Sequence, residues 1–580
     1  MENVSILDTT LATAFVPGSN LKGDVAGANW SFLLPALDLE QILCLGAPPA
    51  STLATLARIG REVTVVCRDT AQVQQVGEAS RQHGLTVVRA VVVDSRVALP
   101  LPDGSADLVV LARAPGASAF RNLGDFGSLR RPVAELERLL RPDGLIYFEF
   151  RGSPDLRLHS PTVKHLVESF GPPRIFRLMP PSGEMQTAVP YRDHQTFNYF
   201  LRHGPHRPPA SLRPFKRAEQ ILERRLIASK YGQRFGVLLG RGAADPEYPP
   251  QYLRTIAEQA GVDLRDHRWG LSAPRDYRSR KVIFLMMDPA TGTPEYIVKM
   301  TRDPAMNPRL ENEHRALVLL REKGIEDRET LPQVSFFGHH NGLAILGETA
   351  IEGRPFRQET DATASCPHFR AATDWLIHLS ATTKSPMDGA AEQVAARLMV
   401  LLGRFEEIYR LTPGQHAFLA DQIGKISRSS TAFPLVFQHG DPGTWNLVVT
   451  PNGRVAFLDW EAAEPEGIPL WDLFYFLRSY SVGAARARGT RDRLKGFAQQ
   501  FLAESPLSLR VVEATRRYCQ QIGLSGHLVE PLFYTCWMHR ALKEANRRGE
   551  ARLENSHYVS LLRLCIEQRS APTLRRLFSL

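Results

Sequence analysis

The chain has 580 residues, too many for a single hydrophobic core, so we expect about two or three domains. Apolar residues make up 43% and charged residues 23% of the chain, which excludes the disordered and collagen-like classes. The formal net charge of +10 favours anionic partners. Lysine and arginine are nevertheless scattered, and no nucleic-acid-binding motif accompanies them, so we expect no nucleic-acid partner.

Cysteine usage and hydropathy bear on the compartment. The six cysteines show no metal-binding spacing, which in a long chain indicates reduced thiols and a cytoplasmic location. Residues 1–18 lack the basic and apolar regions of a signal peptide. No run of about 18 apolar residues occurs, so we expect no transmembrane segment.

The first half of the chain alternates strand-like and helix-like segments, which is the pattern of an α/β domain with a mainly parallel sheet. Strands are predicted at 41–45, 62–67, 86–93, 106–112 and 144–150. Helices are predicted between them at 51–59, 71–83 and 131–140.

Two segments of this region carry a family resemblance. ALPLPDGSADLVVL at 98–111 and ELERLLRPDGLIYFEF at 135–150 resemble the fourth strand and the following helix-strand unit of class I S-adenosylmethionine-dependent methyltransferases. The resemblance implies a Rossmann-like methyltransferase fold over residues 1–204.

The expected cofactor turn departs from the pattern of that family. Family members carry an acid near the end of the first strand and then GxGxG, because glycines let the backbone approach the cofactor. Here the segment reads ILCLGAPPAS. Cys44 takes the place of the acid, Gly46 remains, and Pro48 and Ala50 replace the other two glycines.

Two acids further along also bear on cofactor binding. Cys67 occupies the position of the ribose-binding acid, and Asp69 follows two residues later. Asp94, in the segment VVVD, matches the acid on the adenine side. We therefore expect a methyltransferase-like domain whose S-adenosylmethionine binding is lost or weakened. The alternative is a divergent but functional site at Gly46, Asp69 and Asp94.

A linker is predicted at 205–245, because the stretch HGPHRPPASLRP is typical of a stiff connector. Within the linker, residues 215–239 combine apolar residues at helical spacing with surrounding lysines, arginines and two acids. We expect an interdomain helix that buries its apolar stripe. The alternative is a helix that makes peripheral contact with a membrane surface.

The remaining chain opens with a predicted β-pair at 281–287 and 295–300 and a helix at 310–322. Further on, residues 437–461 read FQHGDPGTWNLVVTPNGRVAFLDWE. A Pro-Asn-Gly turn in this segment precedes an apolar strand predicted at 454–458, which would return the chain to the site.

Three polar residues of this segment suit phosphoryl transfer from a nucleotide, which requires positioning and charge neutralisation. Asp441 would orient or accept the proton of a hydroxyl, and Asn446 and Asp459 would hold Mg²⁺ through oxygen ligands. The alternative is a loop of solvated acids, since Gly-Asp and Asn-Gly pairs are common in turns. That alternative does not explain the order of loop, strand and second acid.

The segment resembles the aminoglycoside phosphotransferase and choline kinase-like family, whose catalytic loop reads HGDxxxxN and whose metal aspartate lies in D-[WFH]-E. His439, which would order the loop, and the three polar residues above match this pattern. The resemblance implies a two-lobed, α+β protein kinase-like domain over 246–580. Its small lobe would cover about 246–350 and its large lobe about 351–580.

The resemblance also implies positions in the small lobe. Lys299 stands where the family places the lysine that contacts the α- and β-phosphates, and Glu313 is its expected ion-pair partner, with Glu311 as the alternative. The backbone from Glu348 to Ile351 would face the adenine.

Two further positions qualify the family pattern. The expected phosphate-covering loop, LSAPRDYRSRK at 271–281, contains no glycine, so side chains would have to bind the phosphates. Asp472, in GIPLWDLFYFL, would brace the catalytic loop without taking part in the reaction.

We therefore expect an ATP-dependent, Mg²⁺-requiring phosphotransferase that acts on a small-molecule hydroxyl. The pairing of domains resembles the bifunctional kinase and methyltransferase enzymes that cap bacterial O-antigen polysaccharides, so a sugar or envelope glycan is the expected acceptor. The alternatives are a methyltransferase with a regulatory kinase-like half and a non-catalytic binding scaffold.

Overall fold

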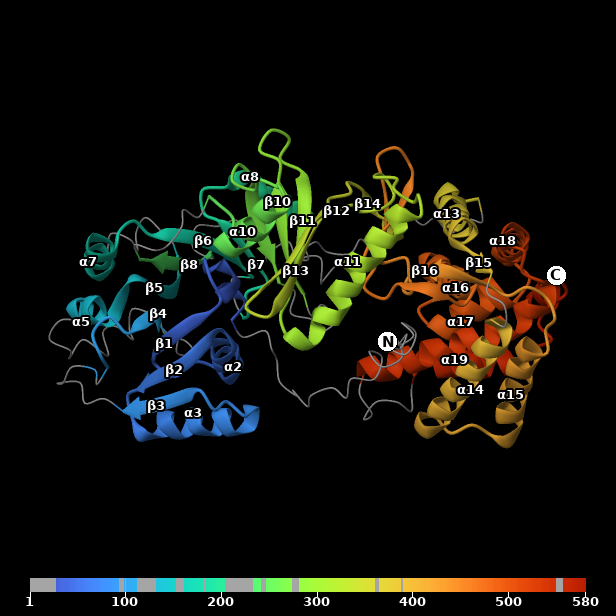
Figure 1. Cartoon of the computed structure of the whole chain (residues 1–580), viewed down its shortest axis with the longest axis horizontal. Helices are drawn as coiled ribbons and strands as arrows, with labels where there is room; N and C mark the ends of the chain where they lie inside the picture. Colours follow the sequence, from blue (N-terminus) through green and yellow to red (C-terminus); the bar gives the residue numbers. More distant parts are fainter. Residues whose placement is uncertain are drawn as a thin grey trace, which may run out of the picture. The chain divides into compact units, whose positions relative to one another are not determined.

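The computed structural model describes most of the chain, in ranges separated by gaps. These ranges are 28–92, 99, 101–111, 132–152, 161–180, 183–203, 233–240, 247–273, 281–359, 365–386, 390–548 and 556–580. The described residues divide into two compact units (Figure 1). The first unit holds 28–310 and Val334–Ala350, and the second holds Glu311–Gln333 and Ile351–Leu580.

A single sheet runs through the first unit. Among the described residues it has 13 strands, in the order β12-β13-β11-β10-β9-β7-β6-β8-β5-β4-β1-β2-β3. The strands are β1 (Leu39–Leu45), β2 (Gly60–Cys67), β3 (Val88–Val92), β4 (Ala106–Leu111), β5 (Leu140–Arg151), β6 (Arg174–Met179), β7 (Thr187–Pro190), β8 (Arg234–Leu239), β9 (Arg268–Ser272), β10 (Lys281–Met287), β11 (Pro294–Thr301), β12 (Val334–His340) and β13 (Leu343–Thr349).

The half of the sheet from β3 to β5 is parallel and is covered by helices on both faces, as the alternating sequence predicts. Ile42 and Cys44 of β1 pack with α2 (Ala50–Ile59) and α3 (Thr70–His83), while Leu43 and Leu45 face α5 (Pro132–Leu139) and α7 (Pro161–Phe170). Alternate residues of one strand therefore serve two separate cores.

The remaining pairings in this sheet are antiparallel, and one of them joins its two halves. β7 pairs with β9 through Thr187 opposite Ser272 and Ala188 opposite Leu271. On one side of this junction lie the strands of the N-terminal region, and on the other lie the strands expected of the kinase small lobe (Figure 1). The first unit also contains η1 (Asn29–Leu33), α8 (His194–His203), α10 (Gln251–Gln259) and η2 (Pro304–Met306).

The helix predicted for 215–239 is wrong over its last residues. Residues 234–239 form β8, which lies between β5 and β6 and is antiparallel to both. The segment RFGVLL is fully buried, and a short apolar run cannot be assigned to helix or strand from periodicity alone. A domain boundary at 204 would therefore cut through this sheet. Residues 204–232, which carry the rest of the predicted helix, lie outside the described part of the chain.

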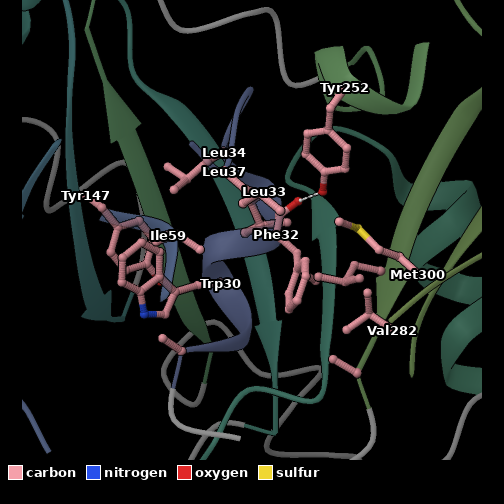
Figure 2. Close-up of a cluster of buried hydrophobic side chains, with 14 of the residues drawn as sticks. Trp30, Phe32, Leu33, Leu34, Leu37, Ile59, Tyr147, Tyr252, Val282 and Met300 are labelled. Atoms are coloured by element: carbon pink, nitrogen blue, oxygen red, sulfur yellow. Dashed lines mark hydrogen bonds between the residues drawn. The ribbon is translucent and has the colours of Figure 1, made fainter. Parts of the chain in front are cut away.

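The segment just before β1 buries Trp30, Phe32, Leu33, Leu34 and Leu37 in the first unit, and we call these five residues the apolar wedge (Figure 2). Trp30 stacks on Tyr147 of β5, with ring centroids 3.7 Å apart and ring planes inclined by 9°. The wedge shares one hydrophobic cluster with Val282 of β10 and Met300 of β11. Tyr252 of α10 fixes it by donating a hydrogen bond of 2.8 Å to the carbonyl oxygen of Phe32.

The second unit is mainly helical and contains two small sheets, β14-β17-β18 and β15-β16-β19. Its strands are β14 (Arg354–Pro355), β15 (Ser385–Pro386), β16 (Pro434–Gln438), β17 (Leu447–Val449), β18 (Val455–Phe457) and β19 (Glu464–Gly467). Its helices are α12 (Phe356–Glu359), α13 (Pro367–Thr383), α14 (Ala390–Ile408), α15 (Pro413–Ser427), α16 (Trp471–Ala487), α17 (Arg493–Phe497), η3 (Ala498–Leu502), α18 (Pro506–Ile522), η4 (Gly526–Leu528), α19 (Val529–Arg548), α20 (His557–Glu567) and α21 (Pro572–Phe578).

Helix α11 (Asn307–Glu322) begins in the first unit and continues in the second. Within the described ranges, no helix is both long and apolar enough to span a membrane.

Removing the Trp30 ring should destabilise the first unit, because a buried aromatic side chain would be replaced by a cavity. We expect Trp30→Ala to lower the free energy of unfolding by about 3–5 kcal/mol in chemical denaturation of the full chain. The matched control is Val92→Ala, since the Val92 side chain is 48% exposed. Equal free energies of unfolding for the two variants would contradict the stabilising role of the apolar wedge.

Candidate active site

The loop that follows β16 carries the predicted motif and is held by a buried carboxylate. Asp472, in the first turn of α16, accepts hydrogen bonds from the backbone N–H groups of His439 (2.6 Å) and Gly440 (3.2 Å to each oxygen). Burial raises the pKa of the Asp472 carboxyl, and the charge of Arg540 opposes that rise. The predicted bracing of the loop by Asp472 is thus present in the structure.

Arg540 of α19 completes the bracing from the other side. Its Nη1 donates a 2.8 Å hydrogen bond to the carbonyl oxygen of Gly440 and lies 3.8 Å from the Asp441 carboxylate. Its Nη2 lies 3.7 Å from Asp472, and its guanidinium stacks 3.5 Å from the ring centre of Tyr475. This buried cation therefore balances the loop carboxylate of Asp441 and the α16 carboxylate of Asp472.

His439 has an ordering role that its hydrogen bonds define. Its Nδ1 accepts from the backbone N–H of Asp441 (3.2 Å), so its Nε2 is left to donate to the carbonyl oxygen of Leu458 (3.1 Å). Burial lowers the pKa of the imidazole, which favours the neutral tautomer that this pattern requires. His439 thus connects the loop to the chain segment that carries Asp459.

The three polar residues of the motif gather at one place. The Asn446 side-chain amide donates to the Asp441 backbone oxygen (2.9 Å) and to its Oδ2 (3.3 Å). The antiparallel pair β17-β18 then returns the chain, and the Leu458 N–H donates to the Asn446 carbonyl oxygen at 2.8 Å. Asp459 follows directly. The predicted hairpin therefore brings Asn446 next to the segment of Asp459.

Asp459 itself adopts an unusual backbone conformation. Its φ of +69° lies in the left-handed region, which residues other than glycine seldom adopt. The next residue, Trp460, is fully buried, and its N–H donates to Glu313 Oε1 at 3.0 Å. Because the surrounding contacts fix this conformation, the Asp459 carboxylate is aimed by the backbone.

Asn446 and Asp459 offer oxygen ligands of the kind that a magnesium ion requires. The Asn446 amide nitrogen faces Asp441, which leaves the amide oxygen to act with the Asp459 carboxylate. Mg²⁺ is typically held by one or two protein oxygen ligands, while water and substrate phosphates complete its shell. The described residues contain no cluster of three or more histidine, cysteine or acidic side chains of the kind that forms an all-protein metal cage.

The small-lobe lysine lies in the first unit. Lys299, on β11, is buried, and its Nζ lies 2.5 Å from Oε1 of Glu348 on β13. Glu348 was expected to contribute its backbone at the adenine, and the structure adds a side-chain ion pair. Glu313 belongs to the second unit, so its pairing with Lys299 stays a prediction. Ile351 directly follows the last residue of the first unit, and 274–280 of the phosphate-covering loop lie outside the described residues.

The predicted methyltransferase cofactor turn has a glycine with positive φ and is followed by a capped helix. Gly46 follows β1 with a φ of +91°, a conformation that suits glycine. Asp69 is the N-cap of α3, and its Oδ1 accepts from the Gln72 N–H at 2.8 Å. Burial raises the pKa of the Cys44 thiol to about 12, so this side chain stays a neutral thiol where the family has an acid. Asp94 lies outside the described residues.

Three contributors to the site were missed from the sequence, and a fourth, Glu348, was predicted at the site with a different role. Arg540 is 100 residues from Gly440 along the chain, and nothing in its local sequence marks it. Tyr475 lies in an apolar helix, and Glu348 was assigned a backbone role only. Trp445 could have been found, because it lies inside the motif itself. Its indole N–H donates to Asp441 Oδ2 at 3.3 Å, and the side chain is 40% exposed.

A family model described as "Phosphotransferase enzyme family" matches residues 276–505. The C-terminal region contains a phosphotransferase-family domain. A second model, described as "Methyltransferase domain", matches residues 43–148, so the N-terminal region is a methyltransferase domain with a Rossmann-like fold. Both predicted families are confirmed.

Several solved structures resemble parts of the chain. WbdD, co-crystallised with the kinase inhibitor LY294002, is 12% identical, with 86% of this chain and 87% of that chain covered and a TM-score of 0.21. A putative fructosamine-3-kinase from Haemophilus somnus 129PT is 11% identical, with 55% and 96% covered and a TM-score of 0.32. YcgJ from Bacillus subtilis is 14% identical, with 36% and 94% covered and a TM-score of 0.21. No functionally curated protein matches the chain significantly.

Gly440 of the phosphotransferase domain should not tolerate a side chain. Its φ is +77°, and a Cβ there would lie 1.8 Å from the Ala462 carbonyl oxygen. Gly453 has the same φ with no atom within 4 Å of that position, so Gly453→Ala is a matched control. We expect Gly440→Ala to lose at least about 2 kcal/mol more unfolding free energy than the control. Denaturation of both variants measures the difference, and equal losses would show that the loop is free to shift.

The methyltransferase domain should bind S-adenosylmethionine weakly or not at all. Pro48 and Ala50 stand where the family has glycines, and Asp69 already caps a helix. In calorimetric titration of the full chain we expect no binding of micromolar affinity. A micromolar or tighter dissociation constant would instead show that the divergent turn still accepts the cofactor.

Proposed function

We propose that the phosphotransferase domain transfers the γ-phosphoryl group of ATP to a hydroxyl of a small molecule. The observation that carries this proposal is the convergence of three residues. Asp441, Asn446 and the segment of Asp459 are joined by hydrogen bonds through a loop and hairpin in the order that the family pattern predicts. The match of residues 276–505 to the phosphotransferase family supports the reaction class.

In this proposal each residue has one task. Asp441 accepts the hydrogen bond of the acceptor hydroxyl and takes its proton as the hydroxyl oxygen bonds to the γ-phosphorus. The bond from that phosphorus to the β,γ-bridging oxygen breaks at the same time, and ADP leaves. Asn446 and Asp459 would hold Mg²⁺, which neutralises phosphate charge when bound. Lys299, held by Glu348, would contact the nucleotide phosphates.

Two features keep Asp441 ready for this task. Its Oδ2 accepts from Trp445 and Asn446, which fixes the orientation of the carboxylate while its side chain remains about one-third exposed, at 33%. Arg540 lies 3.8 Å from the other oxygen and places a positive charge beside the carboxylate. A phosphoryl acceptor hydroxyl requires an oriented and accessible carboxylate of this kind.

A sugar or envelope glycan is the acceptor that we propose to test first. Its support is the pairing of a phosphotransferase domain with a methyltransferase domain in one chain, which is an analogy between domain arrangements.

Asp459→Ala should abolish most ATP turnover, because it removes a carboxylate proposed to hold the metal. We expect a loss on the order of 10³-fold in the rate of Mg²⁺-dependent ATP turnover by the full chain. The matched control is Asp421→Ala, which removes a surface carboxylate on α15 that pairs with Lys425 and Arg428. If Asp459→Ala and wild type turned over ATP at the same rate, this motif would not be the active centre.

A further inference from the structure

Three arginines of the second unit form a positively charged group, which we call the arginine cluster. Arg357 lies on α12, Arg486 lies at the end of α16, and Arg493 begins α17. All three are exposed. Within the described ranges, none of them forms an ion pair with a carboxylate, although such pairs are common elsewhere on this surface.

The members of the arginine cluster act on one another electrostatically. Partial desolvation lowers the pKa of Arg357, and the positive charges of Arg486 and Arg493 lower it further. Desolvation likewise lowers the pKa of Arg493, followed by the charges of Arg478 and Arg486. The negative charge of Glu544 opposes the effect on Arg493. Arginines remain charged in proteins, so the three cations still repel one another, and a bound anion would relieve that repulsion.

The cluster lies beside the proposed catalytic base. The Arg357 guanidinium carbon is 5.2 Å from the ring centre of Trp445. The indole N–H of the same tryptophan donates to Asp441 Oδ2 at 3.3 Å. A single indole side chain therefore separates the first arginine of the cluster from the carboxylate that would receive the acceptor proton.

Acids close to these arginines in the sequence are engaged elsewhere. Glu359, on the same short helix as Arg357, lies 3.2 Å from Arg354. Asp492, next to Arg493, caps α17 by accepting from the Lys495 N–H at 2.9 Å. Among the described acids, none forms an ion pair with the arginine cluster, so its charge is available to a molecule from solution.

We propose that the arginine cluster binds a phosphate or carboxylate group carried by the acceptor, so that this phosphotransferase acts on anionic hydroxyl compounds. The inference rests on the proposed function, because it names the substrate class of the same site. The planar guanidinium donates two parallel hydrogen bonds to phosphate or carboxylate oxygens, which makes arginine well suited to such groups. An acceptor anchored at the cluster would extend across Trp445 and place its hydroxyl at Asp441.

The test measures anion binding while the nucleotide site is occupied. The full chain is saturated with Mg²⁺ and a non-hydrolysable ATP analogue, and inorganic phosphate is titrated by calorimetry. We expect Arg486→Gln/Arg493→Gln to bind phosphate roughly tenfold more weakly or worse than wild type, since charge-assisted hydrogen bonds are lost. The control is Arg516→Gln/Arg569→Gln, which removes the same charge from two exposed arginines outside the cluster and should bind phosphate as wild type does.

Glucose 6-phosphate, glucuronate, glucose and glucosamine then serve as probes of the anionic group under the same conditions. If glucose 6-phosphate binds more tightly than the other three probes, the anionic group is a phosphate ester. If glucuronate binds most tightly, the group is a carboxylate. Stronger binding of glucose or glucosamine than of both anionic probes would overturn the proposal. Equal phosphate affinity of the two double variants would also overturn it. If Arg486→Gln/Arg493→Gln lost affinity for the ATP analogue alone, the cluster would lie at the nucleotide, and the proposal would again be overturned.

These outcomes remain distinct from failure of the proposed function. Unchanged ATP turnover in Asp459→Ala would reject the reaction, whereas the phosphate titration reports on the arginine cluster without any turnover. Melting temperatures of both double variants show whether each is folded, and a value near that of wild type is expected because the substituted residues are exposed.

Discussion

The candidate active site depends on one buried carboxylate. Asp472 accepts the backbone N–H groups of two successive loop residues, His439 and Gly440, and so fixes the turn from which Asp441 projects. A carboxylate in this position would be costly to bury alone, because charge is poorly solvated in a protein interior. The nearby Arg540 guanidinium, itself buried, compensates that cost and also binds the Gly440 carbonyl. The loop is therefore held at both its amide and its carbonyl groups.

The sequence predicted the parallel half of the first unit closely. The observed strands β1, β2, β4 and β5 contain or nearly coincide with their predicted ranges, because each is an apolar run bounded by turn residues. The prediction for β8 was wrong although β8 is also a short apolar run. Its apolar run stands beside a segment with helical spacing, and only its tertiary neighbours β5 and β6 decide that it is a strand.

The candidate site was predictable where its residues are close in the sequence. Asp441, Asn446 and Asp459 lie within one loop and hairpin, so local turn chemistry brings them together. Arg540 comes from a helix distant in sequence, and Glu348 meets Lys299 only because β11 and β13 are neighbours in the sheet. Contacts of this kind arise from topology, which local patterns of residues do not encode.

The continuous sheet of the first unit has a consequence for how the two families share one chain. An ordinary sheet ends in strands whose free N–H and C=O groups can recruit other chains, and natural proteins protect such edges. Here β7 and β9 protect each other, since each would be an edge strand without its partner. Separating the methyltransferase strands from the small-lobe strands would leave β7 and β9 as exposed edge strands with unpaired N–H and C=O groups. The pairing of β7 with β9 therefore covers both edges, and we expect a chain truncated between these two strands to aggregate more readily than the full chain.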